Sequence, residues 1–425
     1  PYYNVGSLED LIGYSRMGTG ATCGTETITE NHEPEIQMPY ESGFFIPIST
    51  PFELRATATD EDGDNLTYIW EQFDLGPVSP IGEPIGNAPL FRSFPPSANG
   101  NTRVFPRIDK IINNDPDNTE VLPTYSRDLT FQFVVRDNNV NHGSTIWQPV
   151  AFRSDETAGP FVVLTGNETG LSWTGGEYRE VTWDVANTTN PRVNCQYVDV
   201  LLSVDGGFTY PYTLLEATPN DGSAFVDVPD LSTNDARIKI KASDNIFFDI
   251  NDFDFAIEPA TEPGYAMNVS PATFPLVCLP SEALSIEVST TSILGFDSTL
   301  TLSLIGELPA GSSASFTSNT VTAGESAFLN LDIAPNQGRD TINLMVQAVI
   351  PGVDTSLREI RVITLSSDYS ALEMLTPVDG QSGIVFSTDF SWQDVPSADR
   401  YDIQIATSPT FEESTIFEEA SGLTD

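Results

Sequence analysis

Residues Asp128–Arg136 read DLTFQFVVR, and this stretch decides the fold class. Its apolar side chains recur at every second position, at Leu129, Phe131, Phe133 and Val135. Because successive side chains of a β-strand point to opposite faces, this spacing predicts a strand with one buried face. The same period recurs in five further segments, at Arg237–Lys241, Ser298–Leu304, Ala327–Ile333, Thr341–Gln347 and Tyr401–Ile405.

Turn sequences separate the predicted strands, and they lie at Asp62–Asp64, Asp205–Gly207, Asn220–Gly222 and Asp379–Gly380. Short strands joined by such turns are typical of β-sandwiches. A single helical pattern covers Ser7–Tyr14, where Ser7 is the expected N-cap and Asp10 the third helical residue. We therefore expect an all-β protein built from tandem immunoglobulin-like β-sandwiches strung end to end.

The length and composition divide the chain into blocks. At about 150 residues per domain, 425 residues correspond to roughly three domains. Residues 259–263 read as a linker, and the last block has only two or three strands, which are marginal alone, so we expect the chain to continue. The first predicted block, residues 1–31, is a linker or the tail of an upstream domain, with one short helix. Three sandwiches follow at 32–158, 159–258 and 264–367, and the first of them has a long irregular insertion at about 76–124. Residues 371–425 are a truncated fourth sandwich.

The charge balance excludes several classes of function. The chain has 18 Lys and Arg against 61 Asp and Glu, a net charge of −43, which argues against nucleic-acid partners and docking on anionic membranes. No apolar run approaches the roughly 20 residues that membrane insertion requires. We expect the charges on outer strand faces, as in Arg237–Lys241, where Ile238 and Ile240 point inward. The acidity suits a solvated surface, a saline environment, or divalent cations that bridge neighbouring subunits.

A series of motifs in residues 1–258 resembles the region that follows the catalytic domain in secreted reprolysin-like zinc metallopeptidases of Bacteroidota. In the first block the motifs are Thr50–Leu54, Ala58–Gln72, Phe91–Ser93 and Arg103–Pro106. In the second they are Ala158–Phe161, Val181–Val185, Val198–Gly207, Thr218–Ser223 and Asn245–Asp249. The first block is also similar to polycystic-kidney-like domains. Residues 264–367 resemble a generic bacterial immunoglobulin-like domain. Residues 371–425 resemble the start of a fibronectin type III domain, with early strands at Phe390–Trp392 and Tyr401–Ile405.

The resemblance implies export by the type 9 secretion system to the cell surface or the medium, with a sorting domain beyond Asp425. It also implies that Pro1–Cys23 is similar to the end of a catalytic domain and that Cys23 has a disulfide partner outside the segment. Zinc peptidases of this class need an HExxH helix, but the only histidines are His32 and His142, and neither lies in such a motif. We therefore predict neither a zinc site nor catalysis in this segment.

The sharpest chemical motif is the turn Asp60–Asn65, which reads DEDGDN. Asp60, Asp62 and Asp64 recur at a spacing of two around a glycine, and Asp137 is the expected partner from a later strand. Calcium takes six to eight oxygen ligands, so these four carboxylates form the candidate Ca²⁺ site. The alternative is a solvated turn in which the aspartates cap backbone amides.

Two other groups of residues have a structural and a functional interpretation. The acidic segment Asp249–Asp254 suits a connection between two strands, with a metal site as the alternative. Trp70, Trp183 and Trp392 lie in alternating segments, and Trp173 is a fourth candidate. For these tryptophans, packing between two sheets is favoured over a platform for carbohydrate.

These observations favour a non-catalytic, extracellular structural or adhesive segment of a large bacterial surface protein, appendage or fibre. The expected partners are other copies of the chain in an oligomer or filament, and a cell-surface or glycan ligand. The alternative is the accessory region of a secreted zinc metallopeptidase whose catalytic domain lies outside this segment. A carbohydrate-binding module is a third hypothesis, and it predicts a line of exposed aromatic side chains on one sheet.

Overall fold

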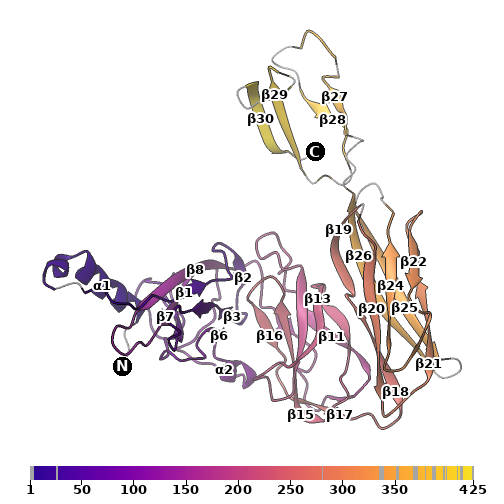
Figure 1. Ribbon diagram of the computed structural model, residues 1–425, viewed down its shortest axis with the longest axis horizontal. Helices are drawn as coiled ribbons and strands as arrows, with labels where there is room; N and C mark the ends of the chain where they lie inside the picture. Colours follow the sequence, from indigo (N-terminus) through magenta and orange to yellow (C-terminus); the bar gives the residue numbers. More distant parts are fainter. Residues whose placement is uncertain are drawn as a thin grey trace. The chain divides into compact units, whose positions relative to one another are not determined.

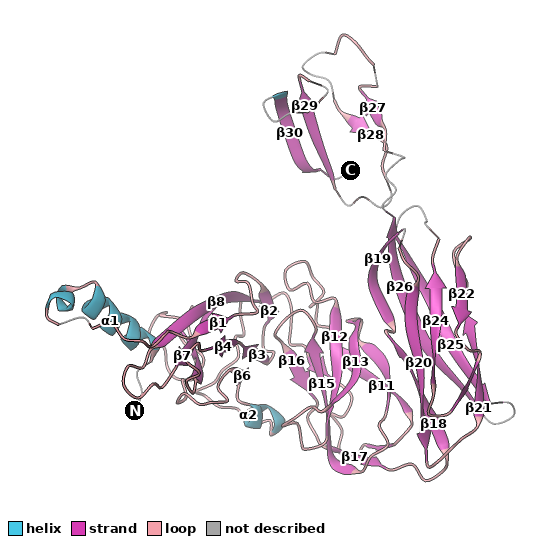
Figure 2. Ribbon diagram, in the orientation of Figure 1, coloured by secondary structure: helices cyan, strands magenta, loops and turns pink. Residues whose placement is uncertain are grey.

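A computed structural model of the chain describes residues 4–24, 27–279, 281–334, 339–350, 354–366, 372–378, 380–384, 389–395, 398, 400–408, 410–411 and 415–423. Strands make up nearly all of its regular structure, which confirms the predicted all-β class of tandem immunoglobulin-like sandwiches (Figure 2). The chain forms two compact units, Pro1–Thr261 and Glu262–Asp425. Within the described part, no helix has both the length and the apolar character that crossing a membrane requires.

The first sandwich is organised around the strand that the sequence singled out. Strand β7 (Arg127–Arg136) is central in a four-stranded sheet, between β5 (Thr67–Gln72) and β8 (Thr145–Asp155), and β8 also pairs with β2 (Phe45–Pro47). The remaining strands of this block form two pairs, β3 (Phe52–Arg55) with β6 (Thr102–Phe105), and β1 (Glu35–Gln37) with β4 (Thr57–Thr59).

A cluster of phenylalanine rings fills the first core. Phe52 has no exposed surface and contacts the rings of four others, Phe91, Phe105, Phe131 and Phe152, at centroid distances of 4.9–5.8 Å. Phe105 comes from the segment expected to be an irregular insertion. That segment is therefore partly regular, since β6 pairs along β3 and supplies one of the most deeply buried rings.

The other face of the same sheet is also covered. Helix α1 (Val5–Arg16) packs Val5 against Ile69 and Val134, which lie on the face opposite to Trp70 and Phe133. Glu71 on β5 is 1% exposed, and its Oε2 atom accepts a hydrogen bond from the backbone N–H of Val5 at 2.7 Å. This contact explains why five consecutive residues of β7, 131–135, are buried although their pattern predicted one buried face.

Helix α1 begins earlier than the sequence predicted. Its N-cap is Asn4, whose side chain accepts a hydrogen bond from Ser7 N–H at 2.9 Å. The prediction that Ser7 caps the helix is therefore wrong, because an amide side chain three residues upstream already satisfies that donor. A short 3₁₀ helix, η1 (Thr19–Thr22), follows α1, and a second α-helix, α2 (Ile108–Ile112), lies in the segment expected to be irregular.

The second sandwich pairs a six-stranded sheet with a three-stranded sheet. The six-stranded sheet contains β10 (Ser172–Thr174), β17 (Phe255–Glu258), β15 (Thr233–Ala242), β12 (Tyr197–Ser203) and β13 (Tyr212–Pro219), with β16 (Phe248–Ile250) pairing to β15. The three-stranded sheet contains β14 (Ser223–Asp227), β11 (Tyr178–Asp184) and β9 (Val162–Val163).

Strand β15 is buried on both faces. Ile238 and Ile240 point into the sandwich as predicted, but Arg237 and Lys239 are each only 6% exposed, so the prediction that they face outward into solvent is wrong. A second apolar cluster covers that face, and it includes residues of the first block; its members are Val104, Ile108, Ile111, Ile112, Tyr210, Phe248 and Ile250. Figure 1 shows α2 on that side, between the strands of the two sandwiches.

Each buried cation finds a partner within this covered face. The Arg237 guanidinium donates to the carbonyl oxygens of Asn251 at 2.6 Å and Ile112 at 3.2 Å, and it forms an ion pair with Asp254 at 2.6 Å. The Lys239 ammonium lies 3.7 Å from the Phe248 ring centroid and 3.6 Å from a Glu53 oxygen. Burial lowers the pKa of Lys239 to about 8.

The second unit contains a separate sandwich. One sheet has β18 (Gly264–Ser270), β20 (Leu284–Ile293), β24 (Ser326–Asp332) and β22 (Ser313–Phe316). The other has β19 (Thr273–Leu279), β26 (Asp354–Ser366), β25 (Arg339–Ile350), β21 (Thr299–Ile305) and β23 (Thr320–Thr322). The predicted strands at 298–304, 327–333 and 341–347 correspond to β21, β24 and β25. Their inward residues, among them Leu300, Leu329 and Leu344, form its core.

Two hairpin-like pairs follow the sandwich of the second unit. Strand β27 (Met374–Thr376) pairs with β28 (Ser391–Trp392), and β29 (Tyr401–Ala406) pairs with β30 (Ile416–Leu423). Strand β29 confirms the strand predicted at 401–405, and its Tyr401 ring packs on Trp392 at 5.3 Å. Asp379 of the predicted turn lies outside the described residues.

Replacing Phe52 by alanine is expected to destabilise both sandwiches of the first unit together. The buried cluster that contains Phe52 continues into the second sandwich, and a bridge pairs Phe52 with Phe247. Removing a fully buried ring costs about 3–5 kcal/mol. In urea unfolding, followed by tryptophan fluorescence, the first unit should unfold in one step at a lower urea concentration. Phe208→Ala, at a ring 58% exposed, should leave the midpoint of that step unchanged. Separate transitions for the two sandwiches would contradict a shared core.

Candidate functional site

The acidic turn and the end of strand β7 meet because of strand register. Asp60 and Asp64 lie in the turn between β4 and β5, and Asp137 directly follows β7. The first residue of β5, Thr67, pairs with Arg136, the last residue of β7, so the turn lies beside Asp137. One carboxylate oxygen from each of the three aspartates lies within 4.8 Å of the others.

Asp62, the fourth predicted ligand, is directed to a different partner. Its Oδ2 atom accepts a hydrogen bond from His32 N–H at 2.6 Å, and its Oδ1 atom lies 3.0 Å from His32 Nδ1. Those two hydrogen bonds lower the pKa of Asp62, while the bond to Asp62 raises the pKa of His32. The structure thus gathers Asp60, Asp64 and Asp137 and places Asp62 against the N-terminal arm.

Asp137 is the most deeply buried member of this acidic cluster, with 1% of its surface exposed. It accepts hydrogen bonds from the Asn31 amide at 2.7 Å and from the Ser144 backbone N–H and hydroxyl at 2.8 Å each. Burial alone would raise the pKa of Asp137, but the hydrogen bonds from Asn31 and Ser144 outweigh it and lower the pKa. Asp137 is therefore held ionised in the folded protein.

Two oxygen atoms at the cluster are buried without a hydrogen-bond donor. They are Oδ2 of Asp60 and Oδ1 of Asn31. The other Asp60 oxygen accepts from the backbone N–H groups of Asp62 and Asp64 at 3.0 Å, as expected for a capping turn. A buried acceptor without a partner costs about 1–3 kcal/mol, and a cation held by the three carboxylates would satisfy the Asp60 oxygen.

The arrangement suits a hard cation. Three carboxylates and one amide oxygen are the ligand types that Ca²⁺ prefers. Close carboxylates repel each other when all are ionised, and a bound divalent cation removes that repulsion. Asn31 was missed in the sequence because it lies 29 residues before Asp60, and its spacing gives no signal.

The second acidic segment does not gather around one point. Asp249 Oδ2 accepts a hydrogen bond from Val163 N–H at 2.7 Å, whereas Asp254 pairs with Arg237. Among the described residues, the acidic cluster at Asp60, Asp64 and Asp137 alone has metal-ligand spacing. The acidic segment therefore serves as a strand connection that also satisfies a buried cation.

Three tryptophans are core residues, as the sequence predicted. Trp70, Trp173 and Trp183 are 1–4% exposed, so their rings are not available to stack on a ligand. Trp183 Nε1 donates to Asn220 Oδ1 at 2.8 Å, and Trp70 Nε1 donates to the carbonyl of Asn101 at 3.2 Å. Both indole donors are therefore satisfied inside the sandwiches.

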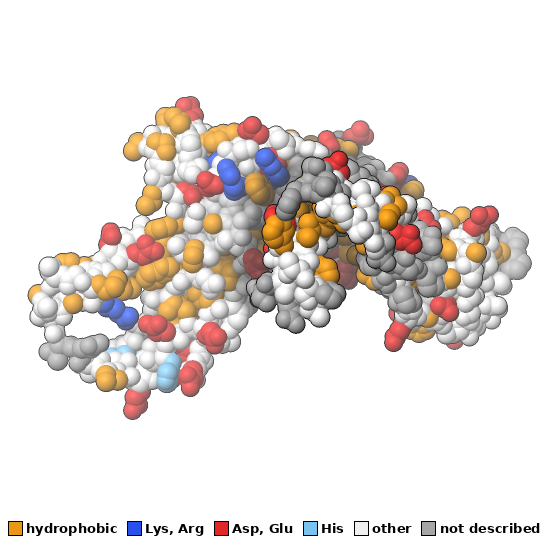
Figure 3. All heavy atoms as spheres, turned by 90° about the horizontal axis from the view of Figure 1, so that it is seen from above, with side chains coloured by type: hydrophobic (Ala, Val, Ile, Leu, Met, Phe, Trp, Pro, Cys, Tyr) orange, Lys and Arg blue, Asp and Glu red, His pale blue; other side chains and the backbone are white. Residues whose placement is uncertain are grey.

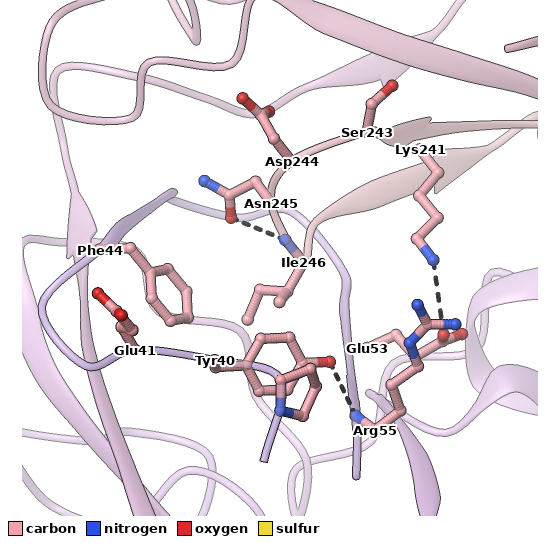
Figure 4. A pocket seen from close by; sticks show the side chains of 11 residues that line it. Tyr40, Glu41, Phe44, Glu53, Arg55, Lys241, Ser243, Asp244, Asn245 and Ile246 are labelled. Atoms are coloured by element: carbon pink, nitrogen blue, oxygen red, sulfur yellow. Dashed lines mark hydrogen bonds and ion pairs between the residues drawn. The ribbon is translucent and has the colours of Figure 1, made fainter. Parts of the chain in front are cut away.

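A polar cavity of about 400 Å³ lies elsewhere in the first unit (Figure 4). Three segments far apart in the sequence line it, at 39–44, 53–55 and 241–246. No motif spacing brings these segments together, so the sequence did not predict the cavity. Two basic side chains, Arg55 and Lys241, line this cavity, although basic residues are few in the chain. On the face in Figure 3, acidic side chains are widely spread, whereas Lys and Arg are sparse.

Comparisons with known proteins give fold-level matches only. No family model and no curated protein match the sequence. Among solved structures, the N-terminal four immunoglobulin domains of Dscam1 are 12% identical with a TM-score of 0.25, and the match covers 92% of this chain and 90% of that one. Domains 1–6 of the surface layer protein SbsC are 9% identical with a TM-score of 0.20, and the match covers 92% of this chain and 49% of that one.

The human desmocollin-1 ectodomain is 11% identical, with a TM-score of 0.21, and the match covers 90% of this chain and 72% of that one. Similarity at this level is insufficient to transfer a function. The resemblance of residues 1–258 to a metallopeptidase-associated region is not confirmed by these comparisons and stays a prediction. The structure records Cys23, Cys195 and Cys278 as free thiols, and a partner for Cys23 outside the segment likewise stays a prediction.

Ionisation of Asp249 is expected to lower the stability of the protein as the pH rises from about 4 to about 7. Burial raises the pKa of Asp249 to about 7, although Val163 N–H donates to it. In this window the folded state keeps a proton that the unfolded state has lost, so the stabilisation present below pH 4 disappears on passing pH 7.

Asp249→Asn should therefore remove this part of the pH dependence and unfold at higher urea concentration than the wild type at pH 8. The gain has an upper limit of a few kcal/mol, since each pKa unit corresponds to about 1.4 kcal/mol. Asp235→Asn removes the same charge from an exposed residue of the same sandwich and serves as the control. An unchanged pH profile in Asp249→Asn would contradict the assignment.

Proposed function

We propose that this chain is a non-catalytic structural or adhesive segment of an extracellular bacterial protein, and that its first unit acts as a rigid spacer. The observation that supports the proposal is the buried cluster that continues from the first sandwich into the second. Contacts between domains in one chain are commonly polar and allow movement. A shared apolar core resists bending, which is what an extracellular spacer that transmits force requires.

Polar contacts reinforce the junction between the two sandwiches. Phe161 N–H donates to the Thr50 hydroxyl at 3.0 Å, and the Asn245 amide donates to the Phe45 carbonyl at 3.0 Å. Glu53 on β3 faces both Lys239 and Lys241 on β15, at 3.6 and 3.8 Å. Since these contacts join elements more than a hundred residues apart, movement of one sandwich against the other would break them.

Calcium at the acidic cluster is the second part of the proposal. Asn31 and His32 lie in the arm that leads from helix α1 to strand β1, and both contact the acidic turn or Asp137. A cation held by Asp60, Asp64, Asp137 and Asn31 would fasten this arm to the first sandwich. Rigidity at the start of the spacer would then depend on calcium.

The third part of the proposal concerns partners and location. We propose that the segment works outside the cell, beside further copies of itself in an oligomer or filament. Its net charge of −43 opposes such packing unless cations screen or bridge the acidic faces. Calcium-dependent assembly would therefore use the same ion that the acidic cluster is proposed to bind.

Calcium should raise the melting temperature of the wild-type chain by about 5–10 °C over the value in EDTA, because binding to the folded state alone stabilises it. Asp137→Asn should lose most of this shift, since it removes charge from the buried side of the cluster. Asp62→Asn is the matched control in the same turn and should keep the shift, because Asp62 contacts His32 instead. Equal melting curves with calcium and EDTA in the wild type would refute the site.

The structural role is tested in the full-length protein by deleting residues 4–258. Loss of surface attachment or of filament formation, with any peptidase activity of the cells unchanged, is the expected result. Antibodies to this segment should label intact cells. Loss of proteolysis with attachment retained would instead support the accessory region of a zinc metallopeptidase.

A further inference from the structure

The cavity in Figure 4 has the features of a ligand site, and the protein's own contacts do not account for them. It lies in the first unit, between the loop that precedes β2, the strand β3, and the turn that follows β15. Its volume of about 400 Å³ lies within the usual range for small-molecule sites. The lining is mixed, with aromatic rings, both signs of charge and neutral hydrogen-bonding groups.

Two aromatic rings of the lining are held in place from behind. The Tyr40 hydroxyl accepts a hydrogen bond from Arg55 N–H at 3.0 Å. The Phe44 ring stacks on the buried Phe152 at a centroid distance of 4.9 Å. In Figure 4 the Tyr40 ring lies at the base of the pocket. These rings therefore give the cavity a rigid apolar surface.

Charged side chains of both signs line the cavity, and Glu53 lies beside the two basic groups, where it pairs with Lys241 at 3.8 Å. Figure 4 shows Arg55 and Lys241 on one side, and Glu41 and Asp244 toward the other. Within the described part of the chain, no hydrogen bond or ion pair engages the side chains of Glu41 or Arg55, and both residues are exposed. An unpaired guanidinium is notable in a protein with 61 acidic and 18 basic residues.

Neutral polar groups complete the lining. The Ser243 hydroxyl donates to Asp199 at 2.8 Å, and the Asn245 amide bonds to the backbone at Phe45, so both side chains are fixed. Asp244 is exposed to solvent at the cavity, so its carboxylate can accept a hydrogen bond from a bound ligand.

We propose that this cavity binds a carboxylated sugar residue, a uronic acid, from a surface or matrix glycan. The carboxylate would pair with the planar guanidinium of Arg55, which can bind it through two parallel hydrogen bonds, with Lys241 nearby. The apolar C–H face of the pyranose ring would pack on Tyr40. Sugar hydroxyls would donate to Glu41 and Asp244, which as carboxylates can only accept.

Other small ligands fit this lining less well. A neutral sugar would cover Arg55 without supplying an anion, and a desolvated charge without a partner is unfavourable. Inorganic phosphate or sulfate would satisfy Arg55 but would bring no ring to Tyr40 and few donors to Glu41 and Asp244. The inference deepens the proposed adhesive role and rests on it for its biological meaning, but it depends on neither the calcium cluster nor the shared core.

The test measures binding of short galacturonic acid and glucuronic acid oligomers to the full chain by calorimetry, at low salt and at roughly 0.15 M salt. The wild type should bind an acidic oligomer, and Arg55→Gln should weaken binding by about tenfold or more, as for loss of a charged hydrogen bond. Arg179→Gln is the matched control, because Arg179 is an exposed arginine of the same unit that pairs with Glu177 and does not line the cavity. Circular dichroism confirms that both variants are folded.

Three results would overturn the proposal. They are no binding of either acidic oligomer by the wild type, equal affinity in Arg55→Gln, and equal affinity for oligomers of neutral galactose. Tighter binding of a sulfated galactose oligomer than of the uronate would overturn the carboxylate assignment. The titration is repeated in EDTA, where uronate binding should persist. If this binding remains but calcium gives no melting shift and the deletion leaves attachment intact, then only the proposed structural role is wrong.

Discussion

Burial of both faces of strand β15 is the constraint on which the first unit depends. Its inner face supplies Ile238 and Ile240 to the second sandwich, and its outer face is covered by helix α2 and neighbouring residues of the first block. Two cations lie in that covered face, and each needs a partner supplied from elsewhere. Glu53 and the carbonyl of Ile112 come from the first block, so the second sandwich depends on the first for its electrostatic balance.

Local patterns were sufficient to predict the strands that alternate most clearly. Alternation in Asp128–Arg136 identified β7 almost to the residue, and the same rule located β21, β24, β25 and β29. The tryptophans Trp70 and Trp183 were correctly expected in the core, since bulky apolar residues in alternating segments have few other places to go. These features depend on residues within a few positions of each other, so the local sequence is sufficient to predict them.

Features that depend on distant segments were not predictable. Arg237 and Lys239 read as solvent-facing because nothing in RIKIK indicates that residues 104–112 will cover them. The contribution of Asn31 to the acidic cluster, and the redirection of Asp62 to His32, follow from where the N-terminal arm lies. The cavity beside Tyr40 is assembled from three separated segments. Each depends on tertiary packing, which periodicity does not report.

The contact between Glu71 and helix α1 determines where the first domain begins, both for expressing it alone and for its transfer between proteins in evolution. A fragment that begins at residue 32 would keep every strand of the first sandwich but lose the helix that covers Ile69 and Val134. It would also leave a carboxylate of the sheet without its backbone donor and newly exposed beside two apolar side chains. The smallest transferable module therefore includes residues 4–16, and an alignment trimmed at the first strand would cut through it.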